Sequence, residues 1–113
     1  MITLKDVMKK TGAEVLAGKA LLDRPVACGY AGDMLSDVLA GAERGGVWLT
    51  VQAHPNIIAV AVMKELSGIL LVNGKRPEPD TLAKAEQEAM PLLSTPLNAF
   101  QAALKLHEAG LSK

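Results

Sequence analysis

Three short apolar runs in this chain each stop at a cluster of small polar residues that leads into a helix-like stretch. The apolar runs and the polar clusters that follow them are 47–51 and 52–56, 68–72 and 73–77, and 91–93 and 94–96. Continuous apolar runs are typical of strands covered on both faces, and their alternation with helices indicates parallel β–α units. We therefore predict an α/β fold with three α/β/α layers, in which helices flank a mainly parallel sheet of about five strands.

The first third of the chain is expected to supply two more strands and two helices. Thr3 and Asp6 have the spacing of a capping box, which opens a helix. Residues 14–17 and 26–30 are predicted to be strands. Asp33 is then predicted to cap a helix, because a short acidic side chain accepts hydrogen bonds from the first free amides.

Asn56 is predicted to cap an unusual helix, because residues 57–63 are apolar on every face. Such a helix must be covered on every face. The sheet can bury one side, and the other side needs a neighbouring helix or a second subunit. We therefore expect the protein to be a homodimer.

The last two helices are expected to be amphipathic covers of the sheet. Asp80 is predicted to cap the first of them, with Leu82, Ala85 and Ala89 facing inward. The second is predicted to open at Pro96 or Leu97. Its predicted inward stripe comprises Leu97, Phe100, Leu104, His107 and Leu111.

Length and composition point to one domain over residues 1–113 without a nucleic-acid partner. Twelve basic residues balance twelve acidic ones, and the chain has one each of Phe, Trp and Tyr. It therefore lacks both the basic surface and the stacking side chains of nucleic-acid-binding proteins. The sequence shows no secretory signal and no apolar run long enough to span a bilayer, so we expect a cytoplasmic location without membrane contact.

No catalytic, metal or cofactor constellation is recognisable. Residues 12–20 have the wrong glycine spacing for a phosphate-binding loop, and residues 29–32 do not match the dinucleotide fingerprint. The lone Cys28 is best explained as a small buried hydrophobe. We predict a protein that is not an enzyme; chemistry at Cys28 or His54 is the alternative that replacement of either residue would test.

The polar residues beyond the strands are the candidate ligand site, since the carboxyl ends of parallel strands meet at one edge of a sheet. The candidates are Thr50, Gln52, His54, Asn56, Asn73, Gly74, Ser94 and Thr95, together with Gly29, Asp33 and Ser36 near the second strand. The free amides at Asn56 and the ring of His54 could hold an anion such as a nucleotide phosphate. Alternatively, Gln52, His54 and Asn56 only satisfy the strand-to-helix turn.

Five segments in this order resemble the DRTGG domain family. They are 23–29 (Asp-Arg-Pro-Val-Ala-Cys-Gly), 32–38, 47–56, 68–74 and 91–95. The chain departs from the family at the signature, where Cys28 stands at the position of the first of two glycines. The resemblance implies a freestanding α/β regulatory or ligand-binding module, related to the N-terminal domain of HPr kinase and lacking its kinase domain.

The function that these observations favour is a non-catalytic regulatory module that acts as a homodimer. It would bind a small anionic ligand, such as a nucleotide, at the strand ends. The alternative is a structural adaptor or accessory protein that docks on a larger enzyme complex without a small ligand.

Overall fold

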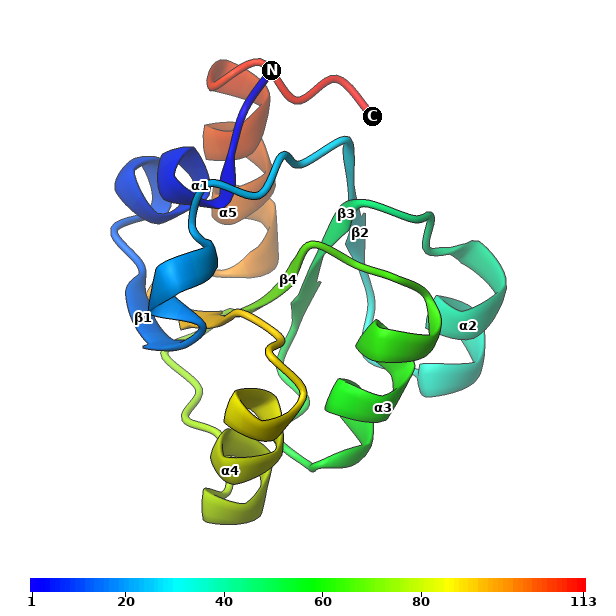
Figure 1. Ribbon diagram of the computed structural model, residues 1–113. Coiled ribbons are helices and arrows are strands. Elements are labelled where there is room, and N and C mark those ends of the chain that lie inside the picture. Colours follow the sequence, from blue (N-terminus) through cyan, green and yellow to red (C-terminus); the bar gives the residue numbers. More distant parts are fainter.

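The computed structural model describes residues 1–113 as a five-stranded sheet with helices on both faces (Figure 1). The strands are β1 (Glu14–Ala17), β2 (Cys28–Ala31), β3 (Gly46–Thr50), β4 (Gly68–Leu71) and β5 (Leu92–Ser94). The helices are α1 (Leu4–Thr11), α2 (Leu35–Gly41), α3 (Asn56–Met63), α4 (Pro79–Gln87) and α5 (Ala99–Glu108), with a short 3-10 helix, η1 (Lys19–Leu21).

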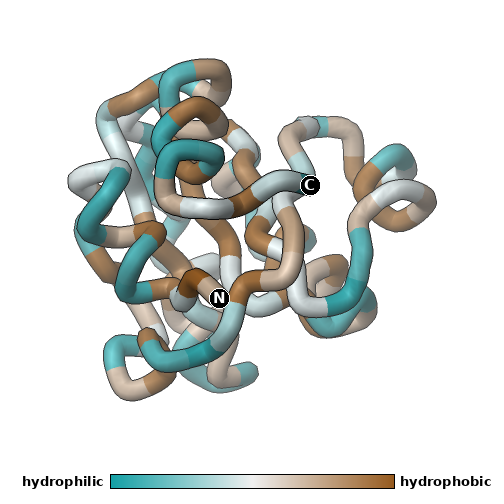
Figure 2. The backbone as a smooth tube through the Cα atoms, turned by 90° about the horizontal axis from the view of Figure 1, so that it is seen from above, coloured by the Kyte–Doolittle hydropathy of each residue, from teal (hydrophilic) through white to brown (hydrophobic).

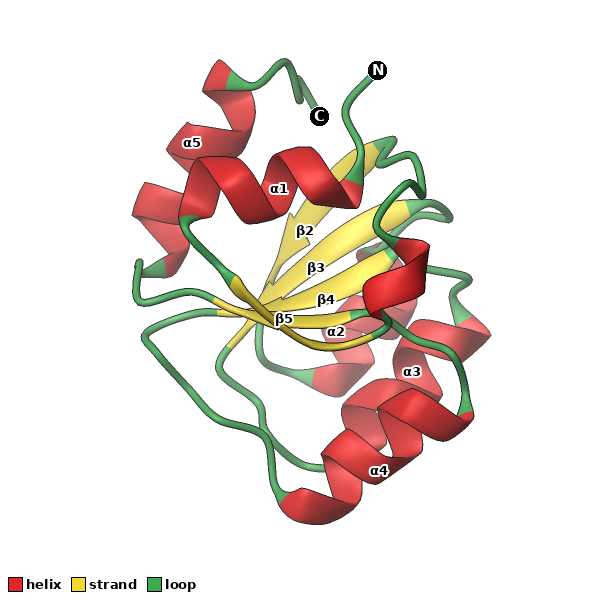
Figure 3. Cartoon of the chain, turned by 60° about the vertical axis from the view of Figure 1, so that its left-hand side comes forward, coloured by secondary structure: helices red, strands yellow, loops and turns green.

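The sheet has the order β1-β5-β4-β3-β2, with β2 to β5 parallel and β1 antiparallel to β5. Figure 3 shows α1 and α5 on one face of the sheet and α2, α3 and α4 on the other. The predicted three-layer α/β fold with a mainly parallel sheet is confirmed. No helix has both the length and the apolar character that crossing a membrane requires.

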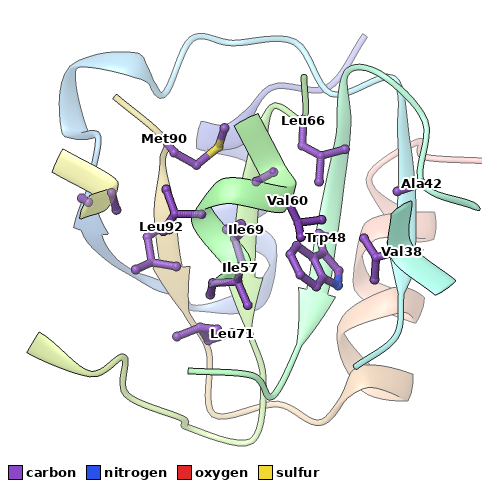
Figure 4. Packing of buried hydrophobic residues seen from close by; sticks show 14 residues of the cluster. Val38, Ala42, Trp48, Ile57, Val60, Leu66, Ile69, Leu71, Met90 and Leu92 are labelled. Atoms are coloured by element: carbon purple, nitrogen blue, oxygen red, sulfur yellow. The ribbon is translucent and has the colours of Figure 1, made fainter. Parts of the chain in front are cut away.

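The central strands are apolar throughout because both of their faces are covered. Every residue of β3, β4 and β5 is buried. Successive side chains point to opposite faces of a strand, so Trp48 packs among α2, α3 and α4, whereas Val47 and Leu49 pack toward α1 and α5. Figure 4 shows Trp48 between Val38 and Val60. Hydrophobic segments accordingly run through the middle of the molecule in Figure 2.

Three predicted helix caps are wrong, and each helix begins in another way. Asp33 lies two residues before α2, which begins at Leu35, and its carboxylate binds the end of β3 instead. Asn56 is the first residue of α3, and its own amide is bonded by His54. Asp80 lies inside α4, which starts earlier because Pro79 has the fixed φ that suits a first helical position.

The capping box at Thr3 and Asp6 is confirmed, and α5 begins with a second one. Asn98 accepts a hydrogen bond from the amide of Gln101, whose side chain accepts one from the amide of Asn98. Helix α5 therefore begins later than the predicted start at Pro96 or Leu97.

The inward faces predicted for α4 and α5 are also wrong in part. On α4, Thr81 and Ala85 are buried, whereas Leu82 is exposed and Ala89 lies beyond the helix end. On α5, Ala102 and Leu106 face the sheet. Helix α5 carries two apolar stripes, one with Ala102 and Leu106 and one with Phe100 and Leu104. The first faces the sheet, because the small Ala102 allows the helix to lie close to the sheet beside α1. Of the predicted stripe, Phe100, Leu104 and His107 are exposed, and Leu97 and Leu111 are only partly buried.

Helix α3 is covered by the sheet and by its neighbours α2 and α4, but not on its outer face. Ile57, Ile58, Val60 and Ala61 are buried. Met63 is 71% exposed, and Ala59 and Val62 are exposed as well. The complete cover that an all-apolar helix calls for is therefore not provided within one chain.

Gly18 follows β1 with a left-handed backbone, and a Cβ there would lie 2.8 Å from the Cα of Pro91. We expect Gly18→Ala to lower the free energy of unfolding by about 2–4 kcal/mol, because it combines backbone strain with a clash against another backbone segment. Urea unfolding measures the loss. The matched control is Gly12→Ala, which has a similar φ and nothing within 4 Å of its added Cβ; an equal loss in both variants would contradict the clash.

Candidate functional site

The carboxyl ends of β2 to β5 lie at one edge of the sheet. The register pairs Ala31 with Leu49, Thr50 with Leu71, and Leu71 with Ser94. The polar segments that follow these strands therefore begin from a common edge.

A hydrogen-bonded cluster of Asp33, Thr50 and Gln52 joins the ends of β2 and β3. Asp33 Oδ1 accepts from Thr50 Oγ1 at 2.9 Å and from the amide of Val51 at 3.0 Å. Gln52 donates through Nε2 to the backbone oxygen of Asp33 at 2.9 Å and through its amide to Thr50 Oγ1 at 3.2 Å. The cluster fixes the start of the loop after β3 and leaves Asp33 Oδ2 without a partner in the chain.

The same segment is also held by backbone and indole hydrogen bonds. Trp48 Nε1 donates to the oxygen of Gly32 at 2.8 Å, and the amide of Gly32 donates to Leu49. Because Trp48 is fully buried, its ring ties the residue before Asp33 to the core. Asp33 is therefore positioned by a rigid part of the fold.

A hollow of about 250 Å³ lies beside the cluster. Its lining residues are Ala31, Gly32, Asp33, Leu49, Thr50, Val51, Val72, Asn73 and Ala99. Three of the candidate residues, Asp33, Thr50 and Asn73, thus share one concave surface. The side-chain amide of Asn73 is exposed and makes no hydrogen bond within the chain, and its backbone is left-handed, with φ 60°.

His54 and Asn56 form the turn between β3 and α3. His54 Nδ1 accepts the amide of Asn56 at 3.1 Å, so Nε2 carries the proton of the neutral ring. The next two amides, of Ile57 and Ile58, donate to the oxygens of His54 and Pro55. The first three amides of α3 are therefore used within the turn and are not free to hold an anion.

Ser94 and Thr95 are buried and serve to fasten neighbouring loops. Ser94 Oγ donates to the oxygen of Lys75 at 2.7 Å, and Thr95 Oγ1 donates to the oxygen of Thr11 at 2.7 Å. The amide of Gly74 donates to the oxygen of Thr95 at 2.8 Å. These residues hold the Asn73–Lys75 loop in place, and their hydroxyl protons are already used.

Gly29 and Ser36 do not line this hollow. Gly29 lies within β2, and its amide donates to the oxygen of Lys113 at 2.9 Å. Ser36 is exposed on α2, and its hydroxyl makes no hydrogen bond within the chain. The structure thus groups Asp33, Thr50 and Asn73, with Gln52 bonded to Asp33 and Thr50, and leaves the other candidates around this group.

The charges at this edge have opposite signs on neighbouring segments. Asp33 contributes a carboxylate to the hollow, whereas Lys75 and Arg76 follow Asn73 on the next loop. Arg76 is paired with Glu14 at 2.9 Å, and that hydrogen bond holds the pKa of Glu14 below its usual value. Lys75, two residues beyond Asn73, makes no ion pair within the chain.

The Asp-Arg signature lies at the opposite edge of the sheet, next to the amino ends of the strands. Arg24 donates to the oxygens of Ser67, just before β4, and of Ala89, just beyond α4. Ser67 Oγ in turn is 2.6 Å from the oxygen of Pro25 and 2.9 Å from that of Gly45. The signature segment is thus tied to the connections that precede β3, β4 and β5. Sequence reasoning missed Ser67, which follows an apolar residue and carries no motif.

Cys28 is buried, with Sγ 4.0 Å from the oxygen of Glu43. Burial, followed by the nearby carboxylate of Glu43, raises the pKa of the thiol. Its interpretation as a small buried hydrophobe is confirmed. The structure also contains no group of three His, Cys, Asp or Glu side chains that could hold a metal ion.

Replacing Asp33 tests whether the cluster holds the site. We expect Asp33→Ala to lower the free energy of unfolding by about 1–2 kcal/mol, because Thr50 and Val51 both lose their acceptor. Asp33→Asn is the matched control; it keeps an oxygen at Oδ1 and should lose less. Urea unfolding measures both, and equal stability of all three proteins would contradict the role of the cluster.

The reactivity of Cys28 follows from its burial and its raised pKa. With less thiolate at a given pH and no access, the folded protein should react with a thiol-specific disulfide reagent more than about tenfold slower than the protein unfolded in guanidinium. Absorbance of the released thiol gives the rate. Equal rates in the folded and unfolded protein would show that the thiol is open to solvent.

Comparison with known proteins identifies the family of the chain and a structure with a similar fold. The model of the DRTGG domain matches residues 6–109. No curated protein matches the chain significantly. The chain is similar to the crystal structure of the CBS and DRTGG domains of the regulatory region of Clostridium perfringens pyrophosphatase, complexed with its activator diadenosine tetraphosphate. The TM-score is 0.72 at 16% sequence identity, over 92% of this chain and 45% of that chain. At this identity the likeness shows the fold.

Proposed function

Since the chain belongs to the DRTGG domain family, as its ordered motifs predict, we propose that it is a non-catalytic regulatory module. In this proposal it acts as a homodimer and binds a small anionic ligand, such as a nucleotide, at the carboxyl edge of the sheet. The observation that carries the proposal is the hollow between the Asp33–Thr50 cluster and the free amide of Asn73.

The polar groups around the hollow suit a ligand with both donors and acceptors. Asp33 Oδ2 can accept from a hydroxyl or an amino group, and the amide of Asn73 can both donate and accept. The hollow of about 250 Å³ is slightly smaller than a usual small-molecule site, so it fits part of a ligand, such as a nucleoside. A nucleoside offers the required hydroxyls and ring nitrogens.

Electrostatics sets the direction in which such a ligand would lie. A phosphate next to the carboxylate of Asp33 would be repelled, whereas Lys75 lies two residues beyond Asn73 without an acidic partner. We therefore place the nucleoside part against Asp33 and the phosphate toward Lys75. The amides of α3, which the sequence suggested for the phosphate, have no part in this arrangement.

The structural neighbour supports the class of ligand. Its regulatory region, which contains CBS as well as DRTGG domains, is complexed with a dinucleotide activator. The present chain corresponds to less than half of that protein. The neighbour therefore supports nucleotides as the first class to test.

Isothermal titration of the protein with adenosine monophosphate, adenosine triphosphate and diadenosine tetraphosphate tests the proposal. We expect at least one to bind, and Asn73→Gly to weaken it about tenfold, the cost of one hydrogen bond. Glycine is chosen because it accepts the left-handed backbone of residue 73.

The matched control is Gln87→Ala, which removes an exposed amide at the end of α4 and should leave affinity unchanged. Absence of binding by every nucleotide at millimolar concentration would contradict the ligand-binding function. Equal loss in both variants would contradict the assignment of the site to Asn73.

The second candidate function is a structural adaptor that docks on a larger enzyme without a small ligand. The exposed outer face of α3, with Val62 and Met63, favours it, because such apolar residues suit a protein partner. Silent titrations together with a monomeric chain in solution would favour the adaptor over the regulatory module.

A further inference from the structure

One strand on the α1–α5 face of the sheet lacks a covering helix. Strands lie about 4.8 Å apart and packed helices about 10 Å apart, so two helices cover roughly four of five strands. The other face has three helices, but this one has only α1 and α5, which lie side by side (Figure 3). The uncovered strand is the edge strand β2.

A hollow of about 260 Å³ lies where the missing helix would be. Its apolar walls come from Gly29, Ala31 and Leu49 of the sheet and from Ala103, Leu106 and Leu111. It exists because β2 presents a glycine and an alanine to this face, where β3 presents Val47 and Leu49. The last residues of the chain fill only part of the space: a Cβ on Gly29 would lie 3.5 Å from Leu111 Cδ2.

Helix α5 carries an apolar stripe along the rim of this hollow. Phe100, the only phenylalanine in the chain, is 73% exposed, and Leu104 is 48% exposed. Together with Ala103 and His107 they occupy positions i, i+3, i+4 and i+7 of one helix face. Ala103 lines the hollow itself, so a projecting aromatic ring and an apolar recess lie one helical turn apart.

We propose that this face docks a second copy of the chain, with the two α5 helices packed antiparallel across a two-fold axis near Ala103. In that arrangement Phe100 of each copy lies over the His107 and Leu111 end of the other, at the mouth of its hollow. Each copy provides one projection and one recess, so a single closed contact fills both. The small Ala103 at the crossing permits close approach of the helices.

The charges of this face agree with self-association. The chain has equal numbers of acidic and basic residues, so two copies carry no net repulsion. On α5 the flanking charges Lys105 and Glu108 pair with each other within the helix, at 4.0 Å. The stripe itself contains no Asp, Glu, Lys or Arg, and Lys113 is the one such residue that lines the hollow.

The outer face of α3 is the competing surface for the same partner. It exposes Met63 and Val62, but α2 and α4 flank it and the sheet beneath is fully covered. A second copy there would cover side chains without filling a recess, whereas the α5 face offers both parts of a knob-in-hole contact. The α5 face is therefore the better match.

The docking face adjoins the candidate ligand site. The two hollows share Ala31 and Leu49, and Ala99 at the start of α5 lines the one beside Asp33. A partner helix over β2 would thus lie next to the bound ligand. The inference rests on the homodimer of the proposed function and does not depend on the ligand.

Sedimentation velocity of the full chain from about 10 to 200 μM tests the inference, since a dimer must dissociate on dilution. We expect a dimer for the natural sequence, a monomer for Phe100→Glu and a dimer for the control Met63→Glu. Both variants place a charge at a similarly exposed position: Phe100 on α5 is 73% exposed and Met63 on α3 is 71% exposed. Ala103→Arg is a second variant at the crossing and should also give a monomer, and circular dichroism verifies folding.

Each other outcome overturns part of the argument. A dimer that survives both Phe100→Glu and Ala103→Arg overturns the α5 interface, and loss of the dimer in Met63→Glu alone assigns it to α3. A natural sequence that stays monomeric at every concentration overturns the homodimer as well. Nucleotide titration is read separately, so failure of the interface and failure of ligand binding are distinguishable.

Discussion

Burial of parallel strands on both faces is the constraint on which the rest of this structure depends. Because β3, β4 and β5 have no solvent face, hydroxyl and charged side chains along these strands are found only at or beyond their ends. The carboxyl ends receive Thr50, Ser94 and Thr95, and the amino ends receive Ser67 and Arg24. The two edges differ in what these groups do. At the amino edge all of them bind other loops, whereas at the carboxyl edge Asn73 and one oxygen of Asp33 remain free.

The general fold was predictable because it depends on patterns that tertiary contacts do not change. Strands apolar along their whole length and the capping box at Thr3 and Asp6 both read directly from local sequence. Helix faces were less predictable. Helix α5 offers two stripes of similar spacing, and the choice between them depends on how closely the helix can approach the sheet beside α1. Only the packed structure shows that Ala102 faces inward and Phe100 outward.

The candidate site was predictable as an edge but not as a set of side chains. Parallel topology alone brings the strand ends together. Which polar groups remain free depends on hydrogen bonds between distant segments, such as those of Asp33 with Thr50 and of Thr95 with Thr11. Asp33 illustrates the difference: a short acidic side chain before a helix normally caps it, but here the end of β3 competes for its carboxylate. No local pattern contains that information.

The position of the family signature explains why family membership says more about fold than about ligand. Arg24 and Pro25, which follow η1, are bonded to Ser67 just before β4 and to Ala89 just beyond α4. These contacts lie at the amino ends of the strands, whereas the hollow beside Asp33 lies at their carboxyl ends. In this chain the signature residues hold the connections of the sheet and take no part in the hollow beside Asp33. In the proposed function, ligand specificity resides in the loops at the carboxyl ends of the strands, where Asn73 and Lys75 follow β4. Members that share the Asp-Arg motif can therefore share a scaffold and still differ in the molecule they recognise.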